Sequence, residues 1–97
     1  MTKVKILVCD SIYEDGIKKL KQAGFEVEVN PTISAEQLKK AVANYDVLIV
    51  RSRTQVTKGI IQAGKNLKVI GRAGAGLDNI DVASAEKRGI LVLNTPE

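Results

Sequence analysis

The sequence contains no histidine, and its 97 residues include a single cysteine. Without an imidazole, these residues cannot form histidine-containing zinc sites, Cys-His or Ser-His-Asp catalytic groups, or any acid–base chemistry that depends on histidine. Cys9 cannot form an internal disulfide and lies in an apolar run, so we interpret it as a buried thiol in a reducing cytoplasm. We therefore expect no metal site and no catalytic residue within this chain, and look to arginines and backbone groups for ligand binding.

Long hydrophobic runs are also lacking. No apolar stretch approaches the roughly 20 residues that cross a membrane, and the first residues do not have the layout of a signal peptide. The composition, with 44% hydrophobic and 27% charged residues, is typical of a globular domain. We expect one cytoplasmic domain with no membrane partner.

A net charge of +4 raises the question of nucleic-acid binding. The lysines concentrate on the polar faces of two predicted helices, with almost no aromatic residues beside them to stack on bases. We interpret these faces as solvated and expect no nucleic-acid partner. The residues concerned are Lys18, Lys19, Lys21, Lys39 and Lys40.

Five short apolar runs predict five β-strands. They are Val4–Cys9, Phe25–Val29, Val47–Val50, Leu67–Ile70 and Ile90–Leu93. Continuous apolar runs indicate strands covered on both faces. The strict alternation of apolar and acidic residues in the second run indicates a half-exposed edge strand.

Helix signals separate these runs. Ser11 with Glu14, and Ser34 with Gln37, have the spacing of capping boxes. Thr57 and Asp81 are predicted to cap two further helices. Glycines end three of the four helical patterns, at Gly24, Gly64 and Gly89.

Strands and helices therefore alternate along the whole chain. This order predicts an α/β fold, a flavodoxin-like doubly wound sheet of five parallel strands in the order 2-1-3-4-5, with helices on both faces. The alternating strand Phe25–Val29 is then at an edge.

Ligands of such sheets bind beyond the carboxyl ends of the strands. Arg51-Ser52-Arg53-Thr54 follows the third predicted strand, and residues 71–78, containing Gly71, Gly74 and Gly76, follow the fourth. Side chains at i and i+2 share a side, so Arg51 and Arg53 could converge on one anion. A glycine-rich loop can present backbone N–H groups to the same anion, and Arg72 lies within it. These features predict a small, multiply charged anion as the ligand.

The glycine-rich loop begins like the dinucleotide fingerprint G-x-G-x-x-G, but Asn79 occupies the third glycine position. No acidic residue follows a second strand at the distance of about 20 residues that the fingerprint requires. We therefore do not expect a complete nucleotide site within this chain.

Three segments resemble the D-isomer-specific 2-hydroxyacid dehydrogenases, and most closely the amino-terminal substrate-binding domain of their 3-phosphoglycerate dehydrogenase branch. They are Val50–Thr54, Leu67–Asp81 and Lys87–Pro96. The resemblance implies an NAD-dependent oxidation of 3-phosphoglycerate to 3-phosphohydroxypyruvate, the entry step of serine biosynthesis.

The resemblance also implies roles for individual residues. Arg51 and Arg53 resemble residues that bind the substrate phosphate, and Ser52 and Arg72 resemble further residues of the substrate site. Ala73, Gly74 and Ala75 resemble a nest for the substrate carboxylate, with Ala75 also approaching the nicotinamide. Asn94, Thr95 and Pro96 resemble the hinge that leads to a separate NAD-binding Rossmann domain.

On this interpretation, residues 1–97 form a substrate-binding domain, and NAD is held mainly by a domain that this chain lacks. The 97 residues alone are then expected to be inactive, and they could form a homo-oligomer. Another D-2-hydroxyacid dehydrogenase, acting on glycerate, glyoxylate or lactate, is the first alternative.

A non-catalytic flavodoxin-like binding or signalling module is the second alternative. A phosphoacceptor module would need an aspartate at the end of the third strand, where this chain has Val50-Arg51. A flavin module would need a hydroxyl- and glycine-rich phosphate loop after the first strand, where this chain has Asp10-Ser11-Ile12-Tyr13-Glu14.

Overall fold

The computed structural model describes residues 3–12, 14–74 and 76–95. Strands and helices alternate through these residues, with one short 3-10 helix, η1, after the second α-helix. The elements are β1 (Lys5–Val8), α1 (Glu14–Gln22), β2 (Glu26–Val29), α2 (Ala35–Ala41), η1 (Val42–Asn44), β3 (Val47–Val50), α3 (Lys58–Ala63), β4 (Val69–Ala73), α4 (Val82–Lys87) and β5 (Leu91–Thr95).

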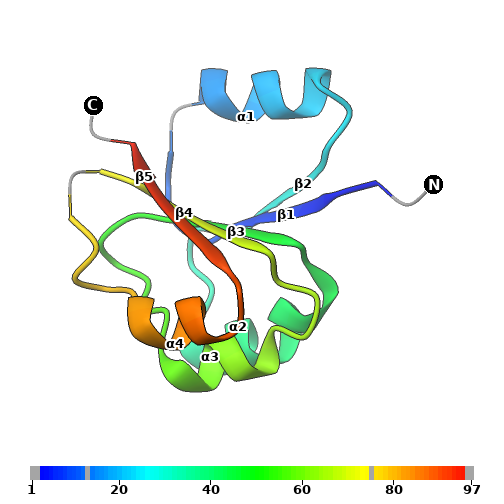
Figure 1. Cartoon of the computed structure of the whole chain (residues 1–97). Helices are drawn as coiled ribbons and strands as arrows, with labels where there is room; N and C mark the ends of the chain where they lie inside the picture. The colour runs from blue at the N-terminus through cyan, green and yellow to red at the C-terminus, as the bar shows by residue number, and fades with distance from the viewer. Residues whose placement is uncertain (1–2, 13, 75, 96–97) are drawn as a thin grey trace.

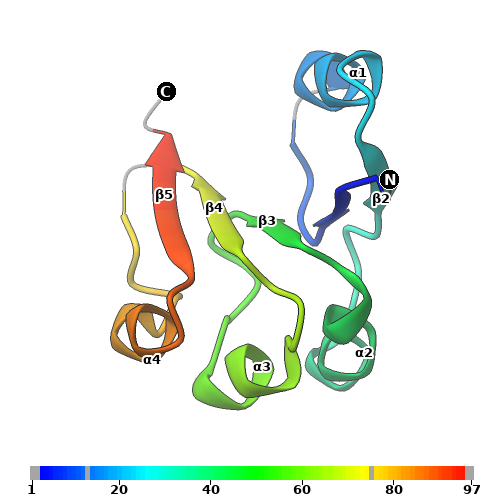
Figure 2. The same cartoon turned by 45° about the vertical axis from the view of Figure 1, so that its right-hand side comes forward.

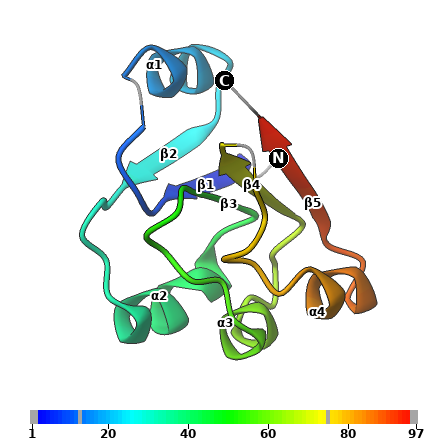
Figure 3. The same ribbon diagram turned by 90° about the vertical axis from the view of Figure 1, so that its left-hand side faces the viewer.

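The strands form one parallel sheet in the order β2-β1-β3-β4-β5, which confirms the predicted topology (Figure 1). Strand β2, whose apolar residues alternate with Glu26 and Glu28, lies at one edge as the sequence predicts. Strand β5 lies at the other edge (Figure 3). Because β1, β3 and β4 are adjacent, the loops that follow them leave the sheet side by side.

The helices cover the two faces of the sheet unequally. Helices α2, α3 and α4 lie on one face, whereas α1 lies on the other, over the β2 and β1 side (Figure 2). On the three-helix face, Leu7, Leu48 and Ile70 pack in one buried cluster with residues of all three helices. Residues of a strand alternate between faces, so Ile6 and Val8, also buried, point toward α1.

The part of the sheet farthest from α1 is less covered on that face. Leu91 and Leu93 of β5 remain 55% and 48% exposed. They share a face with Val69 and Gly71 of the neighbouring β4, their register partners.

No described helix is long and apolar enough to span a membrane.

Three of the four predicted helix caps are confirmed. The Ser34 hydroxyl accepts the Gln37 N–H while the Gln37 side chain accepts the Ser34 N–H, which completes the predicted capping box of α2. Thr57 caps α3, and Asp81 caps α4. The Ser11 prediction was wrong, because Ile12 lies outside the helix and α1 begins only at Glu14.

The predicted end of the fourth strand was also wrong. Strand β4 continues through Gly71, Arg72 and Ala73, which pair with Leu93, Asn94 and Thr95 of β5. Glycine lowers strand propensity, but here a neighbouring strand on each side supplies the ladder hydrogen bonds. The glycine-rich loop therefore begins at Gly74.

Replacing Ser34 with alanine is expected to lower the free energy of unfolding by about 1 kcal/mol, because the N-cap acceptor of α2 is lost. Urea denaturation at neutral pH measures the change. Ser34→Asp, which keeps an acceptor oxygen, serves as the control and should retain most of the stability. Equal midpoints for Ser34→Ala and the unsubstituted chain would contradict this role.

Candidate functional site

Two loops meet at the carboxyl edge of the sheet. Residues 51–57 join β3 to α3, and residues 74–81 join β4 to α4. Val50, the last residue of β3, is in register with Arg72 of β4, so both loops start from neighbouring positions. Between them, Val56 and Ile80 form an isolated parallel bridge, and the Val56 N–H donates to the Asn79 carbonyl at 2.8 Å. The site predicted from the sequence is thus formed by two loops that are bonded to each other.

Asp10, two residues after the end of β1, holds the first loop from one side. Asp10 is 3% exposed, and its carboxylate accepts the Arg51 N–H at 2.6 Å and the Thr54 N–H at 3.2 Å. It also accepts the Thr54 hydroxyl at 2.6 Å and Arg53 Nε at 2.8 Å. Four donors therefore surround one buried anion.

The ionisation of Asp10 follows from this environment. Burial raises the pKa of Asp10, but the hydrogen bonds from Thr54 and Arg51 and the positive charge of Arg53 outweigh it. The net result is a pKa below the ordinary value, so Asp10 is a carboxylate at neutral pH.

Asn79 holds the same loop from the other side. Its Nδ2 donates to the carbonyl of Arg51 at 2.5 Å and to the carbonyl of Thr54 at 2.7 Å. Asn79 is 7% exposed, and its Oδ1 is buried without a hydrogen-bond partner among the described residues. The residue that breaks the glycine fingerprint is therefore a bridge between the two loops.

Most of the Arg53 guanidinium is engaged inside the protein. Besides Asp10, it donates to the carbonyl oxygens of Ile33 and Cys9, at 3.2 and 2.6 Å, and to the Thr54 hydroxyl at 3.2 Å. Four of the five N–H groups of the side chain are used in this way. Even so, 49% of the side chain remains exposed at the protein surface.

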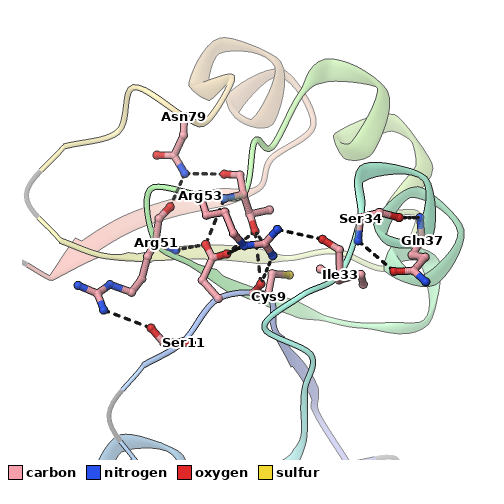
Figure 4. A network of polar contacts seen from close by, with 10 residues as sticks. Cys9, Ser11, Ile33, Ser34, Gln37, Arg51, Arg53 and Asn79 are labelled. Carbon is pink, nitrogen blue, oxygen red and sulfur yellow. Dashed lines mark hydrogen bonds and ion pairs between the residues drawn. The ribbon is translucent and has the colours of Figure 1, made fainter.

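Arg51 is differently placed. It is exposed, and its Nη1 makes one long hydrogen bond, 3.3 Å, to the Ser11 carbonyl. In Figure 4 its guanidinium points away from that of Arg53. Both arginines nevertheless line one open pocket of about 230 Å³. Asp10, Ser11, Pro31 and Ser52 complete its walls.

Arg72 turns toward the glycine-rich loop. Its Nη1 donates to the Gly76 carbonyl at 2.6 Å. Gly74 has φ +148°, and a Cβ there would lie 3.2 Å from the same Nη1. The glycine at this position thus provides both an unusual backbone conformation and space for the arginine.

The remaining predicted site residues lie at the ends of β4 and β5. Ala73 pairs with Thr95, and Asn94 pairs with Arg72. Ala75 and Pro96 lie outside the described residues. Of the predicted site residues, Arg51, Ser52 and Arg53 line one pocket. Arg72, Ala73, Gly74 and Asn94 are not among the residues that line it.

Cys9 is fully buried, as the sequence predicts. Burial, reinforced by the negative charge of Asp10 and opposed by Arg53, raises the pKa of the thiol to about 12. Such a thiol is protonated and unreactive at neutral pH. In the described part of the chain, no three His, Cys, Asp or Glu side chains are grouped to hold a metal ion.

Comparison with known proteins identifies the family to which this chain belongs. Residues 6–97 match the catalytic domain of D-isomer specific 2-hydroxyacid dehydrogenases. The chain belongs to this family. Family membership agrees with the resemblance of the two loops and favours a dehydrogenase domain over a signalling module.

Among curated family members, the D-3-phosphoglycerate dehydrogenases of Archaeoglobus fulgidus and Methanocaldococcus jannaschii are 48% and 51% identical, over 96% and 97% of this chain. The chain spans 18% of the length of each. The hydroxypyruvate reductase of Thermotoga maritima is 46% identical over 99% of this chain, which covers 31% of that protein.

Solved structures show the same fold. NAD⁺-bound 3-phosphoglycerate dehydrogenase of Entamoeba histolytica superposes with a TM-score of 0.85 at 35% identity, covering 98% of this chain and 33% of that one. A protein of Pyrococcus horikoshii superposes with a TM-score of 0.91 at 33% identity, over 97% of this chain and 28% of its own.

Asp10→Asn is expected to lower the free energy of unfolding at pH 7 by about 2 kcal/mol, since an amide cannot accept all four charge-assisted hydrogen bonds. Because folding lowers the pKa of Asp10, its stabilising contribution is complete above the unfolded pKa, about 3.9, and declines as the pH falls through the folded value. The difference between variant and unsubstituted chain should therefore shrink in acid.

Urea unfolding at pH 7 and near pH 3 measures this dependence. Asp46→Asn is the control, because Asp46 also accepts a backbone N–H, that of Lys5, but is more exposed. A difference of the same size at both pH values would contradict an ionised Asp10.

Proposed function

We propose that this chain is the substrate-binding domain of an NAD-dependent D-3-phosphoglycerate dehydrogenase, which oxidises 3-phosphoglycerate to 3-phosphohydroxypyruvate for serine biosynthesis. The observation that carries the proposal is the open pocket at the carboxyl edge of the sheet, where Arg51, Ser52 and Arg53 meet. The identity of about 50% to relatives with that name supports it.

The chemistry of this pocket suits a phosphorylated acid. Arg51 is exposed and can offer a two-point hydrogen bond to phosphate oxygens, and Ser52 adds a hydroxyl beside it. Arg53 contributes its charge and its exposed part, although most of its N–H groups hold the protein itself. We assign the phosphate of the substrate to these three residues.

The glycine-rich loop would bind the carboxylate end of the same substrate. Gly74 has no side chain to cover its backbone, and the bond from Arg72 to the Gly76 carbonyl supports the curvature of the loop. We assign the carboxylate to the backbone of Ala73, Gly74 and Ala75, near the positive charge of Arg72.

The glycine-rich loop departs from the dinucleotide fingerprint, because the buried Asn79 occupies the position of the third glycine. We therefore propose that NAD is held mainly by a separate Rossmann domain, with Asn94, Thr95 and Pro96 as the connection to it and Ala75 facing the nicotinamide.

Hydride transfer from an alcohol requires a base for the hydroxyl proton and a nicotinamide to accept the hydride. When bound, NAD supplies the hydride acceptor. The sequence has no histidine to act as the base. The role of this chain is thus to bind and orient the acid, so that its C2 hydroxyl faces groups supplied by another domain.

A second candidate is a dehydrogenase for an unphosphorylated acid, such as glycerate or hydroxypyruvate. Two observations favour it: Arg53 is largely engaged within the protein, and a hydroxypyruvate reductase is 46% identical to the chain. The affinity ratio between 3-phosphoglycerate and D-glycerate separates the candidates.

Arg51→Ala is expected to weaken 3-phosphoglycerate binding by about 1 to 3 kcal/mol, roughly 5- to 150-fold, while leaving stability nearly unchanged. Arg53→Ala should weaken binding and also lower stability, because it breaks the bonds to Asp10, Ile33 and Cys9. Calorimetric titration and urea unfolding measure the two effects.

Lys65→Ala is the control, because it removes an exposed positive charge after α3, before β4 begins. It should bind 3-phosphoglycerate as the unsubstituted chain does. Equal affinity in the Arg51 and Lys65 variants would remove Arg51 from the site. Equal affinity of the unsubstituted chain for 3-phosphoglycerate and D-glycerate would favour the second candidate.

The 97 residues supplied with 3-phosphoglycerate and NAD⁺ are expected to form no NADH, because we place the base and the nucleotide site in a separate domain. Absorbance at the NADH band over a long incubation measures turnover. A rate above that of the heat-unfolded chain would show that the catalytic groups lie within these residues after all.

A further inference from the structure

We propose that Asp10 and Asn79 are positioning residues of the substrate site. They fix the backbone of residues 51–54 and thereby place Arg51 and Ser52 for the anion. The inference rests on the proposed function, because it concerns the same pocket. It adds two residues that do not need to touch the substrate.

The geometry supports this role, since both residues hold the same two positions of the loop. The N–H groups of Arg51 and Thr54 donate to Asp10, whereas the carbonyl groups of Arg51 and Thr54 accept from Asn79. The backbone is thus held through its donors and its acceptors at once. Only residues 52 and 53 lie between the two fixed points.

The segments that carry these residues follow neighbouring strands. Asp10 follows β1, and Asn79 lies in the loop after β4, while the loop itself follows β3. Strands β1, β3 and β4 are neighbours in the sheet. The loop is therefore held between an anchor beyond the end of β1 and an anchor in the neighbouring loop, which the Val56–Ile80 bridge joins to it.

The chemistry of each anchor is specific. Asp10 faces only donors, and an ionised carboxylate is the side chain that accepts without donating. Asn79 faces two carbonyl groups, so it must donate twice, which an aspartate cannot do. Neither residue can be exchanged for its near-isosteric partner without turning attraction into repulsion.

Asn79 also carries a cost that bears on its role. Its Oδ1 is buried without a partner in the described part of the chain, which is unfavourable. An apolar residue at position 79 would avoid that cost but would leave the carbonyls of Arg51 and Thr54 without their donor. The amide of Asn79 compensates for this cost by holding residues 51–54 in place.

Binding affinity is sensitive to such positions, because hydrogen bonds weaken steeply when their distance and angle depart from the optimum. Asp10→Asn and Asn79→Asp are therefore expected to weaken 3-phosphoglycerate binding by about tenfold, the loss of roughly one charge-assisted hydrogen bond. Titration should be done by calorimetry at a temperature where each variant is fully folded by circular dichroism.

Two matched control variants change residues at the amino ends of the strands, away from the pocket. Asp46 lies directly before β3 and accepts the Lys5 N–H at 2.9 Å. Asn66 precedes β4 and donates to the Ala43 carbonyl at 2.9 Å. Asp46→Asn and Asn66→Asp make the same chemical changes away from the pocket and should keep the affinity within about twofold.

Hydrogen exchange provides a readout that a general loss of stability does not reproduce. In Asp10→Asn, the amides of Arg51 and Thr54 should exchange faster, whereas amides in the β1–β2 ladder should not change by more than the shift in global stability. If Asp10→Asn does not fold, Thr54→Val removes one bond to Asp10, and should weaken binding about threefold.

The outcomes separate the two proposals. Weaker binding in both site variants, with unchanged controls, supports the positioning role. Unchanged affinity in folded Asp10→Asn and Asn79→Asp overturns it while leaving the proposed function intact. Absence of 3-phosphoglycerate binding by the unsubstituted chain overturns the proposed function, and the positioning role with it.

Discussion

The buried carboxylate of Asp10 is the constraint on which the rest of the site depends. A charge that is 3% exposed is tolerated only where donors replace the lost water, and here four donors converge on it. Three of these come from Arg51 and Thr54, so satisfying the charge determines the path of the chain after β3. The fourth comes from Arg53, whose other N–H groups reach Cys9 and Ile33. The interaction that makes the carboxylate acceptable therefore also connects three segments of the protein.

The three arginines at this edge have different surroundings. Arg51 is exposed beside the pocket, Arg53 crosses beneath the loop, and Arg72 holds the carbonyl of Gly76. A pair of charges such as Arg53 and Asp10 contributes little net potential at a distance, whereas Arg51 has no carboxylate within ion-pair distance among the described residues. Arg51 therefore carries a positive charge that no described carboxylate neutralises, which suits the proposed binding of an anion in this pocket.

The sequence predicts the architecture better than the site. Periodic apolar runs and the cap at Ser34 depend on neighbours a few residues away, so the strand order, the edge strand and three helix starts could be predicted. The bonds of Asp10 to the loop join residues 41 to 44 positions apart, which no local pattern reveals. In the sequence, Asn79 stands out only as the residue in place of a third glycine. Asp10 and Asn79 do carry one local signal, since a polar residue next to a buried strand or within a glycine-rich turn needs hydrogen-bond partners. The end of β4 could not be predicted from Gly71, because the adjacent strands decide how far the backbone pairing of β4 continues.

The double attachment of residues 51 and 54 has a consequence for how this loop can change. Both the carboxylate and the amide reach two backbone groups that are three positions apart. An inserted or deleted residue between them would rotate one of those groups out of reach and leave polar atoms buried on each side. Most surface loops accommodate length variation readily, but this one should not. Redesign of the pocket, in the laboratory or by descent, is accordingly restricted to exchanging the side chains at 51, 52 and 53 on a backbone of fixed length.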